Sequence, residues 1–278
     1  MWLAYAATYL HNIHMDKHSL AVALSIAGSD SCGGAGIQAD LKTFTVLGVY
    51  GMTVLTAITA QNTLGVQAVV ELSPEIIREQ FRSVTSDIVP SAVKTGMLAS
   101  AAIINLVADE LTTLGCPYVC DPVMVAKSGD QLLTPGAASA IRERLLPIAW
   151  VLTPNRFEAQ QLLGTEVRTL EQARGAARAL AMLGPRSVII KGIEHGTGIC
   201  DVLYDGGEYV ILEGQKQPLG KSHGSGCTFS AAITAELAKG SSLVQAARTA
   251  RILIDDAIRE SFSACKGANP VNVLAYRR

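Results

Sequence analysis

Short continuous apolar runs alternate along the chain with amphipathic stretches. Residues 20–27 form such a run, ended by Gly28, and residues 51–60 form a second one that is rich in β-branched side chains. A run without polar alternation is typical of a strand that is buried on both faces, as in a parallel sheet. Residues 37–47, between the two runs, follow the helical period. The pattern therefore predicts parallel strands joined by crossover helices.

The same alternation continues toward the C-terminus. It predicts strands over residues 92–95, 118–120, 150–152 and 187–191, a hairpin of residues 200–204 and 209–213, and helices over residues 73–87, 99–114, 135–146, 155–163, 169–183, 229–239 and 242–260. We therefore expect an α/β protein with three layers, α/β/α, and a mainly parallel central sheet. Residues 19–278 are expected to form one domain. Residues 1–18 do not fit the alternation, so we expect a disordered or poorly packed extension, or a start at Met15.

Composition and charge exclude several classes of function. The 278 residues carry a net charge of −1 and only 5% aromatic side chains, which gives neither an electrostatic footprint nor a stacking platform for nucleic acid. The apolar runs are far too short to span a bilayer. The six cysteines contain no CxxC pair, so reduced thiols in a cytoplasmic protein are expected.

A glycine-rich turn precedes the helix predicted from Phe229. It reads His223-Gly224-Ser225-Gly226-Cys227-Thr228. Such a turn leaves backbone N–H groups unpaired at the helix N-terminus, and the helix dipole adds partial positive charge there. The turn is therefore a candidate phosphate site, with an ordinary flexible loop as the alternative interpretation.

A second glycine-rich loop resembles a dinucleotide fingerprint. Gly34-Ala-Gly36-Ile-Gln-Ala39 fits the pattern G-x-G-x-x-A between a predicted strand and a predicted helix. A true fingerprint has an acidic residue about 20 positions further on, to hold the ribose. Residues 59–62 stand there as Thr-Ala-Gln-Asn, and Asp40 comes too early. A nicotinamide cofactor is therefore only a minor possibility.

Polar residues follow three of the other predicted strands. Asn155 and Glu158 share the first turn of a helix, where they can hold Mg²⁺ or its waters, or simply form a capping box. Asp121 follows the strand of residues 118–120 and can meet a cation or a phosphate, or form a turn with Pro122. Lys191 ends a strand and can reach a phosphate as a point charge, or be a solvated surface lysine.

These groups together are the equipment of phosphoryl transfer, in which catalysis is mostly positioning and charge neutralisation. An anion hole, a cationic side chain and oxygen ligands are all predicted at the carboxyl ends of strands. The sequence contains no G-x-x-x-x-G-K-[ST] motif, so a P-loop fold is excluded.

Several longer motifs add a family resemblance. They are Ile26-Ala-Gly-Ser-Asp-Ser-Cys-Gly-Gly-Ala-Gly-Ile-Gln-Ala-Asp-Leu-Lys-Thr-Phe44, Thr59-Ala-Gln-Asn-Thr63, Lys94-Thr-Gly-Met97, Asp121-Pro-Val-Met124, Thr153-Pro-Asn155 and His223-Gly-Ser-Gly-Cys-Thr-Phe-Ser-Ala-Ala232. In this order they resemble the hydroxymethylpyrimidine/phosphomethylpyrimidine kinases of thiamine biosynthesis, in the ribokinase-like superfamily. The resemblance spans roughly residues 20–272.

The resemblance implies an activity, a fold and a set of site residues. The implied enzyme has a ribokinase-like fold and uses ATP and Mg²⁺ to phosphorylate 4-amino-5-hydroxymethyl-2-methylpyrimidine and then its monophosphate. The implied pyrimidine pocket holds Gly28, Asp40, Gln61 and Met97. The implied catalytic anion hole, ATP contacts and magnesium site involve Gly224, Ser225, Gly226, Cys227, Thr228, Lys191, Asp121, Asn155 and Glu158. A homo-oligomer is expected, with a dimer favoured.

One departure from the wider superfamily concerns Cys227. Many sugar kinases of the superfamily have an aspartate base at this position. A thiol is a poorer base, although a helix N-terminus is expected to lower its pKa. Cys227 therefore either takes the substrate proton or only shapes the anion hole, and the neighbouring His223 is interpreted as a plain loop residue.

Two other functions stay open at this point. A pyridoxal or pyridoxine kinase of the same superfamily shares most of the motifs. A non-catalytic binding or regulatory protein can use the same fold. The presence of Asp121, Asn155, Glu158, Lys191 and Cys227 together speaks against the second alternative.

Overall fold

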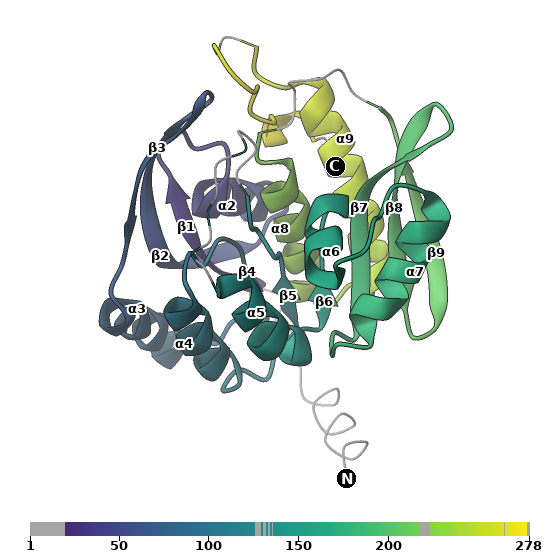
Figure 1. The fold of residues 1–278 in the computed structure, drawn as a ribbon. Helices are drawn as coiled ribbons and strands as arrows, with labels where there is room; N and C mark the ends of the chain where they lie inside the picture. The colour runs from purple at the N-terminus through teal and green to yellow at the C-terminus, as the bar shows by residue number, and fades with distance from the viewer. Residues whose placement is uncertain are drawn as a thin grey trace.

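A nine-stranded sheet runs through the centre of the protein (Figure 1). The computed structural model describes residues 20–125, 129, 132, 134, 136–216, 223–263 and 265–276. The extension predicted for residues 1–18 lies outside the described residues. Along the sheet the strand order is β3-β2-β1-β4-β5-β6-β7-β8-β9.

The strands are β1 (Val22–Asp30), β2 (Tyr50–Asn62), β3 (Gly65–Glu71), β4 (Ala92–Thr95), β5 (Tyr118–Cys120), β6 (Val151–Leu152), β7 (Ser187–His195), β8 (Gly198–Asp205) and β9 (Glu208–Gly214). The six strands β2, β1, β4, β5, β6 and β7 pair in parallel. The strand β3 lies antiparallel to β2 at one edge. At the other edge β8 and β9 are also antiparallel. The sheet is therefore mixed but mainly parallel, which confirms the predicted architecture.

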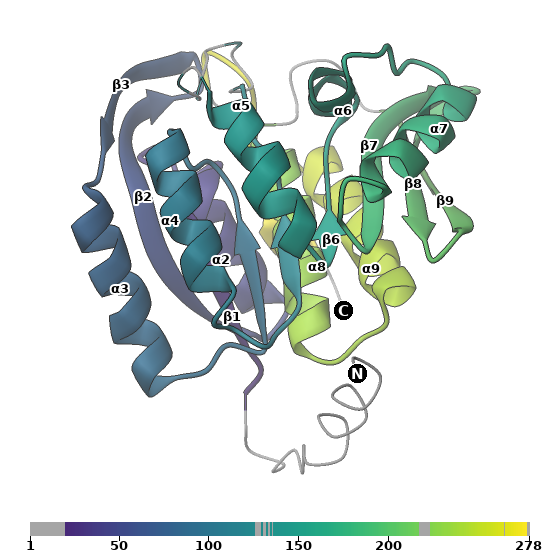
Figure 2. The same cartoon turned by 60° about the horizontal axis from the view of Figure 1, so that its bottom comes forward.

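Helices cover both faces of this sheet (Figures 1 and 2). One layer consists of α2 (Gly36–Val46), α8 (Ser225–Ala238) and α9 (Leu243–Arg259). The other consists of α3 (Pro74–Asp87), α4 (Ala101–Leu111), α5 (Ala137–Ala140), α6 (Arg156–Leu163) and α7 (Leu170–Ala181). Two hydrophobic clusters, one under each layer, make up the core. Every residue of β4, β5 and β6 is buried, because these strands are covered on both faces.

Several boundaries differ from the sequence-based expectation. The strand β3 was not predicted, since its residues are largely exposed at the sheet edge and carry no buried apolar face. The helix expected over residues 135–146 is a short α5 followed by a π-helical turn, Ile141–Leu145, and a 3₁₀ turn, Leu146–Ile148. The helix α8 starts at Ser225, four residues before the expected start, so part of the glycine-rich turn belongs to the helix itself.

The chain reverses its direction of travel across the sheet at β1. From β1 the chain passes through α2 to β2 on one side, and after β3 and α3 it returns to β4 on the other side. Ligands bind beyond the carboxyl ends of the strands at such a switch point. Asp30 and Thr95 end β1 and β4 there, so the fold predicts a ligand site at this edge of the sheet. Within the described ranges, none of the helices has the length and apolar character that a membrane crossing requires.

Candidate active site

The N-terminus of α8 forms the predicted anion hole. Gly224 is the N-cap with φ of 81°, and the Thr228 N–H donates to the Gly224 carbonyl at 2.9 Å. The N–H groups of Ser225, Gly226 and Cys227 precede this bond, so they are the donors that a helix leaves unpaired at its N-terminus. No bond from these three N–H groups to a described residue is present, so they can meet an anion.

The ammonium group of Lys191 lies beside this helix end. A Cβ placed on Gly226 would lie 3.5 Å from Lys191 Nζ, and Lys191 Nζ donates to Asp121 Oδ1 at 2.9 Å. Burial alone would lower the pKa of Lys191, but Asp121 and then Glu158 outweigh it and raise that pKa. The lysine is therefore charged at neutral pH, and its side chain is only 12% exposed, so the alternative of a solvated surface lysine is wrong.

A β-bulge aims Lys191 at the site. The register of β7 against β8 shifts between Ile190 and Ile193, so Lys191 and Gly192 bulge opposite Asp201. Asp201 Oδ1 accepts the Gly192 N–H at 2.8 Å, and the buried Arg251 donates to the other oxygen at 3.1 Å. Bulges re-aim side chains next to active sites, and Asp201 holds this one.

Asn155 and Glu158 form the predicted capping box of α6. Asn155 Oδ1 accepts the N–H groups of Phe157 and Glu158, and Glu158 Oε2 accepts the Asn155 N–H at 2.8 Å. Burial, followed by the negative charge of Asp121, raises the pKa of Glu158 to about 7, although Lys191 opposes the shift. The capping role alone thus uses one carboxylate oxygen.

The donor set fits a magnesium ion that keeps most of its waters. In the described part of the chain no group of three or more His, Cys, Asp or Glu side chains could hold a metal by itself. Asp121 is occupied by Lys191, Thr153 and Ser230, whereas Glu158 Oε1 has no hydrogen bond to any described residue. Mg²⁺ is commonly held by one or two carboxylates plus water and phosphate oxygens, which matches a single available carboxylate oxygen.

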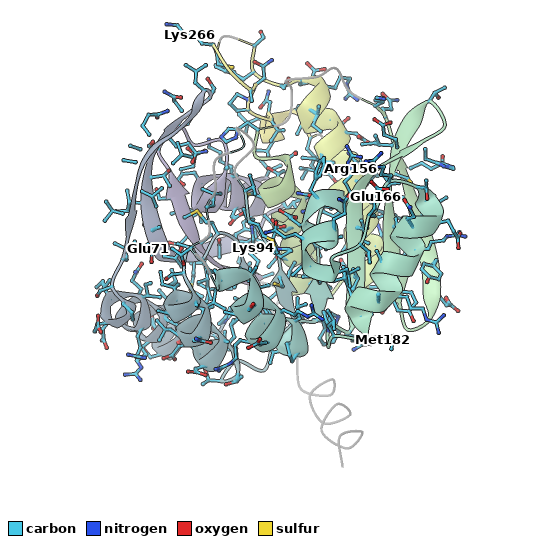
Figure 3. All side chains as sticks on the ribbon, in the orientation of Figure 1. Glu71, Lys94, Arg156, Glu166, Met182 and Lys266 are labelled. Carbon is cyan, nitrogen blue, oxygen red and sulfur yellow. The ribbon has the colours of Figure 1, made fainter. Side chains whose placement is uncertain are left out.

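The predicted pyrimidine pocket contains a buried ion pair that the sequence did not reveal in full. Lys94 Nζ lies 2.7 Å from Asp40 Oδ1, and the Ser25 hydroxyl donates to Asp40 Oδ2 at 2.5 Å. Both charged side chains are fully buried. Figure 3 shows Lys94 in the interior, whereas Lys266 and Met182 lie at the periphery. Burial would lower the pKa of Lys94, but Asp40 and Cys227 raise it, so the ammonium stays charged.

The other predicted pocket residues lie around the ends of β1, β2 and β4. A Cβ on Gly28 would lie 2.8 Å from Met97 Cε, so these two residues touch. Gln61 exchanges two hydrogen bonds with Ser31, through its backbone N–H and carbonyl, each at 2.8 Å. Its side-chain oxygen accepts from Thr59 at 3.3 Å. No bond from the Gln61 side-chain NH₂ group to a described residue is present.

The environment of Cys227 is opposite to that expected from its place in the helix. Its half-buried thiol has its pKa raised to about 11, first by burial and then by Asp40 and Asp121, while Lys94 and the Gly36 N–H oppose the shift. The net pKa of Cys227 is therefore raised, not lowered as expected from the helix N-terminus alone. At neutral pH Cys227 carries its proton and acts as a neutral polar group.

The loop with the dinucleotide pattern has its N–H groups occupied by the protein itself. Asp30 Oδ2 accepts the N–H groups of Gly34 and Ala35 at 3.1 and 2.8 Å, and Oδ1 accepts that of Cys32 at 2.9 Å. His223 Nε2 lies 3.0 Å from Asp30 Oδ2, and both side chains are buried. A pyrophosphate would find these donors taken, and His223 is a buried partner of Asp30 rather than a plain loop residue.

One hydroxyl at the anion hole lacks a partner. Thr228 Oγ1 is buried and makes no hydrogen bond within the described residues. A buried polar atom without a partner costs free energy, so its presence beside the helix N-terminus fits a hydroxyl that contacts a phosphate oxygen. Thr228 is among the residues predicted to contact ATP.

The chain is similar to known kinases over nearly its whole length. The family model described as phosphomethylpyrimidine kinase matches residues 30–272. A hydroxymethylpyrimidine/phosphomethylpyrimidine kinase of Streptomyces coelicolor is 47% identical over 90% of this chain and 93% of that protein. One from Rhizobium meliloti is 49% identical over 86% and 90%.

The chain is also similar to solved structures of pyridoxal kinases and of a phosphomethylpyrimidine kinase. A Bacillus subtilis pyridoxal kinase in an ADP complex has a TM-score of 0.84 and 43% identity, covering 92% of this chain and 98% of that one. A Staphylococcus aureus pyridoxal kinase with AMP-PCP and pyridoxal has a TM-score of 0.86 and 37% identity, covering 94% and 96%. A Clostridium difficile phosphomethylpyrimidine kinase has a TM-score of 0.77 and 40% identity, covering 86% and 100%. The chain belongs to the phosphomethylpyrimidine kinase family and has its ribokinase-like fold.

Proposed function

We propose that this site transfers the γ-phosphoryl group of Mg²⁺-bound ATP to the hydroxymethyl group of 4-amino-5-hydroxymethyl-2-methylpyrimidine, and then phosphorylates the monophosphate. Family membership gives the hydroxymethylpyrimidine and phosphomethylpyrimidine kinase activity in thiamine biosynthesis. The assignment of roles to residues is our proposal. The observation that carries it is the position of Lys191 Nζ beside the N-terminus of α8, 3.5 Å from where a Cβ of residue 226 would lie.

The chain's own residues act by holding charge in place. The N–H groups at residues 225–227 bind the oxygens of the γ-phosphoryl group, and Lys191 neutralises the charge that develops during transfer. Asp121 fixes the lysine at 2.9 Å. The alcohol oxygen forms a bond to the γ-phosphorus, and the bond from phosphorus to the bridging oxygen breaks, so that ADP leaves. Of the three predicted magnesium residues Glu158, Asp121 and Asn155, Glu158 would hold the ion through Oε1, and magnesium bound there with ATP would add charge neutralisation at the phosphates.

The raised pKa of Cys227 supports a role as a neutral wall of the anion hole. A thiol with a pKa of about 11 is a poor proton acceptor at neutral pH. In a loose transition state the attacking hydroxyl loses its proton late, so a strong base is not required. We therefore assign Cys227 to the shaping of the site and not to proton removal.

The substitution Gly226→Asp tests the anion hole. The new Cβ would lie 3.5 Å from Lys191 Nζ, so the carboxylate would pair with the lysine and occupy the phosphoryl position. Transfer should be nearly abolished while the thermal unfolding temperature changes little. Gly240→Asp at the other end of α8 is the matched control, because a Cβ there meets nothing within 4 Å. An active Gly226→Asp enzyme would remove this loop from the mechanism.

We propose that Gln61 favours the pyrimidine over pyridoxine. Its unpaired side-chain NH₂ group and its oxygen can bond the ring nitrogen and exocyclic amine of an aminopyrimidine, an edge that pyridoxine lacks. Gln61→Met should lower kcat/KM for the pyrimidine roughly 10- to 1000-fold and that for pyridoxine little. Gln67→Met, on the exposed strand β3, is the control. Equal losses for both substrates would show that Gln61 does not discriminate between them.

We also propose a homodimer through the edge formed by β2 and β3. Ile58 and Val70 lie directly opposite each other across these strands, and their side chains are 49% and 63% exposed. An exposed apolar edge invites pairing with another chain. Val70→Lys should give a monomer in analytical ultracentrifugation, whereas Val89→Lys, at another exposed valine, should not. A wild-type monomer would refute the proposal.

We further expect this ATP-dependent chemistry to take place in the cytoplasm. All six cysteines are free thiols, a form that a reducing compartment maintains. Fractionation of cells that express the protein would test this expectation, and recovery outside the cytoplasm would contradict it.

A further inference from the structure

The two glycine-rich loops of the site press directly against each other. A Cβ placed on Gly224 would lie 1.6 Å from the Gly34 carbonyl oxygen, and one on Gly34 would lie 2.3 Å from the His223 ring. The loop after β1 and the start of α8 are thus in backbone contact with no room for a side chain between them.

Asp30 and His223 join the two loops by a buried polar contact. Asp30 ends β1 and holds the N–H groups of its own loop, while its Oδ2 also meets His223 Nε2 at 3.0 Å. Burial would raise the pKa of Asp30, but the bonds from His223, Cys32 and Ala35 lower it. The Asp30 carboxylate is therefore ionised. It bonds the N–H groups of its own loop and also His223, which lies 193 residues further along the sequence.

Further bonds link this contact to the C-terminal segment and to the end of β2. His223 donates its backbone N–H to the Asn269 carbonyl at 3.0 Å, and its own carbonyl accepts from Val271 at 3.1 Å. On the other side, Ser31 of the Asp30 loop bonds Gln61. The Asp30–His223 pair thus lies between the elements assigned to the pyrimidine and the helix assigned to the phosphoryl group.

We propose that the Asp30–His223 pair is a positioning device that fixes the spacing between the alcohol pocket and the anion hole, so that the phosphoryl group goes to the bound alcohol and not to water. The inference rests on the proposed function of the site. The alcohol pocket is held by the loop whose N–H groups Asp30 accepts, and the anion hole is held by the N-terminus of α8. Each of the two therefore keeps its own local structure. Loss of the link should therefore misalign two substrates that still bind, and a misplacement of about 1 Å can cost 10²-fold in rate.

Loss of the Asp30–His223 contact should change which acceptor receives the phosphoryl group. In the aligned site the alcohol oxygen bonds the γ-phosphorus, the electron pair of the broken P–O bond leaves with ADP, and the alcohol proton passes to solvent. In a misaligned site a water oxygen takes the place of the alcohol, and ADP and inorganic phosphate result. Uncoupled hydrolysis distinguishes lost alignment from a general loss of folded protein.

The test compares His223→Met, which removes the donor, with His223→Gln, whose amide can donate from nearly the same place. For His223→Met we expect kcat of transfer to fall about 100-fold, both KM values to stay within about threefold, and the ratio of ADP released to pyrimidine phosphorylated to rise well above one. His223→Gln should restore most of kcat and the coupling. His195→Met, at an exposed histidine that ends β7, should behave as the wild type.

ADP release is followed by a coupled assay and phosphorylated pyrimidine by chromatography, with thermal unfolding as a measure of the folded fraction. Should His223→Met be too unstable to assay, His223→Asn, which is polar but too short to reach Asp30, carries the same expectation. Unchanged kcat and coupling, or KM values that rise while the ratio stays at one, would overturn the positioning role. A wild-type enzyme that fails to phosphorylate the pyrimidine would instead refute the proposed function itself.

Discussion

Gly224→Ala tests the loop contact on which the geometry of the site depends. Gly224 has φ of 81°, a left-handed conformation that costs an L-residue roughly 1–2 kcal/mol. The added Cβ would also lie 1.6 Å from the Gly34 carbonyl oxygen, whereas real Cβ contacts are essentially never shorter than 3.0 Å. The two loops must then move apart by about 1.4 Å, the difference between these two distances.

Gly240→Ala separates the two costs. Gly240 follows α8 with φ of 84°, and a Cβ there meets nothing within 4 Å. The conformational cost is therefore common to both variants, and only Gly224→Ala adds the clash. Overpacking of this kind costs about 1–3 kcal/mol, so Gly224→Ala should lose that much more free energy of unfolding than Gly240→Ala. A displacement above 1 Å between substrate sites should also lower kcat/KM for transfer about 100-fold, with Gly240→Ala close to wild type.

Urea denaturation and the transfer assay measure the two quantities. The reasoning is refuted by equal losses of unfolding free energy in both variants, since the contact between the loops would then be absent. It is also refuted by a destabilised Gly224→Ala enzyme of full activity, because the spacing of the loops would then not matter to transfer.

Substitutions at three further positions test other parts of the site. Glu158→Gln keeps the capping acceptor but removes the charge, so the magnesium concentration for half-maximal rate should rise about tenfold while the unfolding temperature changes little; an unchanged requirement with lower stability would leave capping as the only role. Cys227→Ser should retain measurable activity and Cys227→Ala less, because a neutral donor suffices; equal and complete losses would support a thiolate. With a pKa of about 11 against the usual 9.0, Cys227 should also react with iodoacetamide at pH 8 about 100-fold more slowly than an ordinary thiol. Asp201→Asn loosens the bulge that aims Lys191, so KM for ATP should rise about tenfold; Asp205→Asn, at the other end of β8, is the control, and equal effects would deny Asp201 a special role.

The sequence predicted the interior of the fold better than its edges. The short runs at residues 92–95, 118–120 and 150–152 correctly predicted β4, β5 and β6. Strands that are buried on both faces are nearly continuously apolar, which makes them easy to recognise in a sequence. The edge strand β3 was missed for the opposite reason, since its largely exposed residues follow no pattern that burial imposes. The domain boundary at residue 19 stays a prediction.

Within the site, local motifs were readable and long-range partners were not. The capping box of Asn155 and Glu158 was predicted because both residues lie in one helical turn. The partners Asp40 and Lys94 are 54 residues apart, and Asp30 and His223 are 193 apart. No periodicity connects such pairs, so only the folded sheet, which brings the ends of β1, β4 and α8 together, reveals them.

The pKa of Cys227 shows why a local rule can fail at an active site. A helix N-terminus favours a thiolate, and this effect acts over about one turn of helix. Here burial and the carboxylates of Asp40 and Asp121 act on the same sulfur and outweigh it. Those carboxylates are present because Lys94 and Lys191 each need a partner when buried. The cations that prepare the site for phosphate thus bring along the negative charges that keep its thiol protonated.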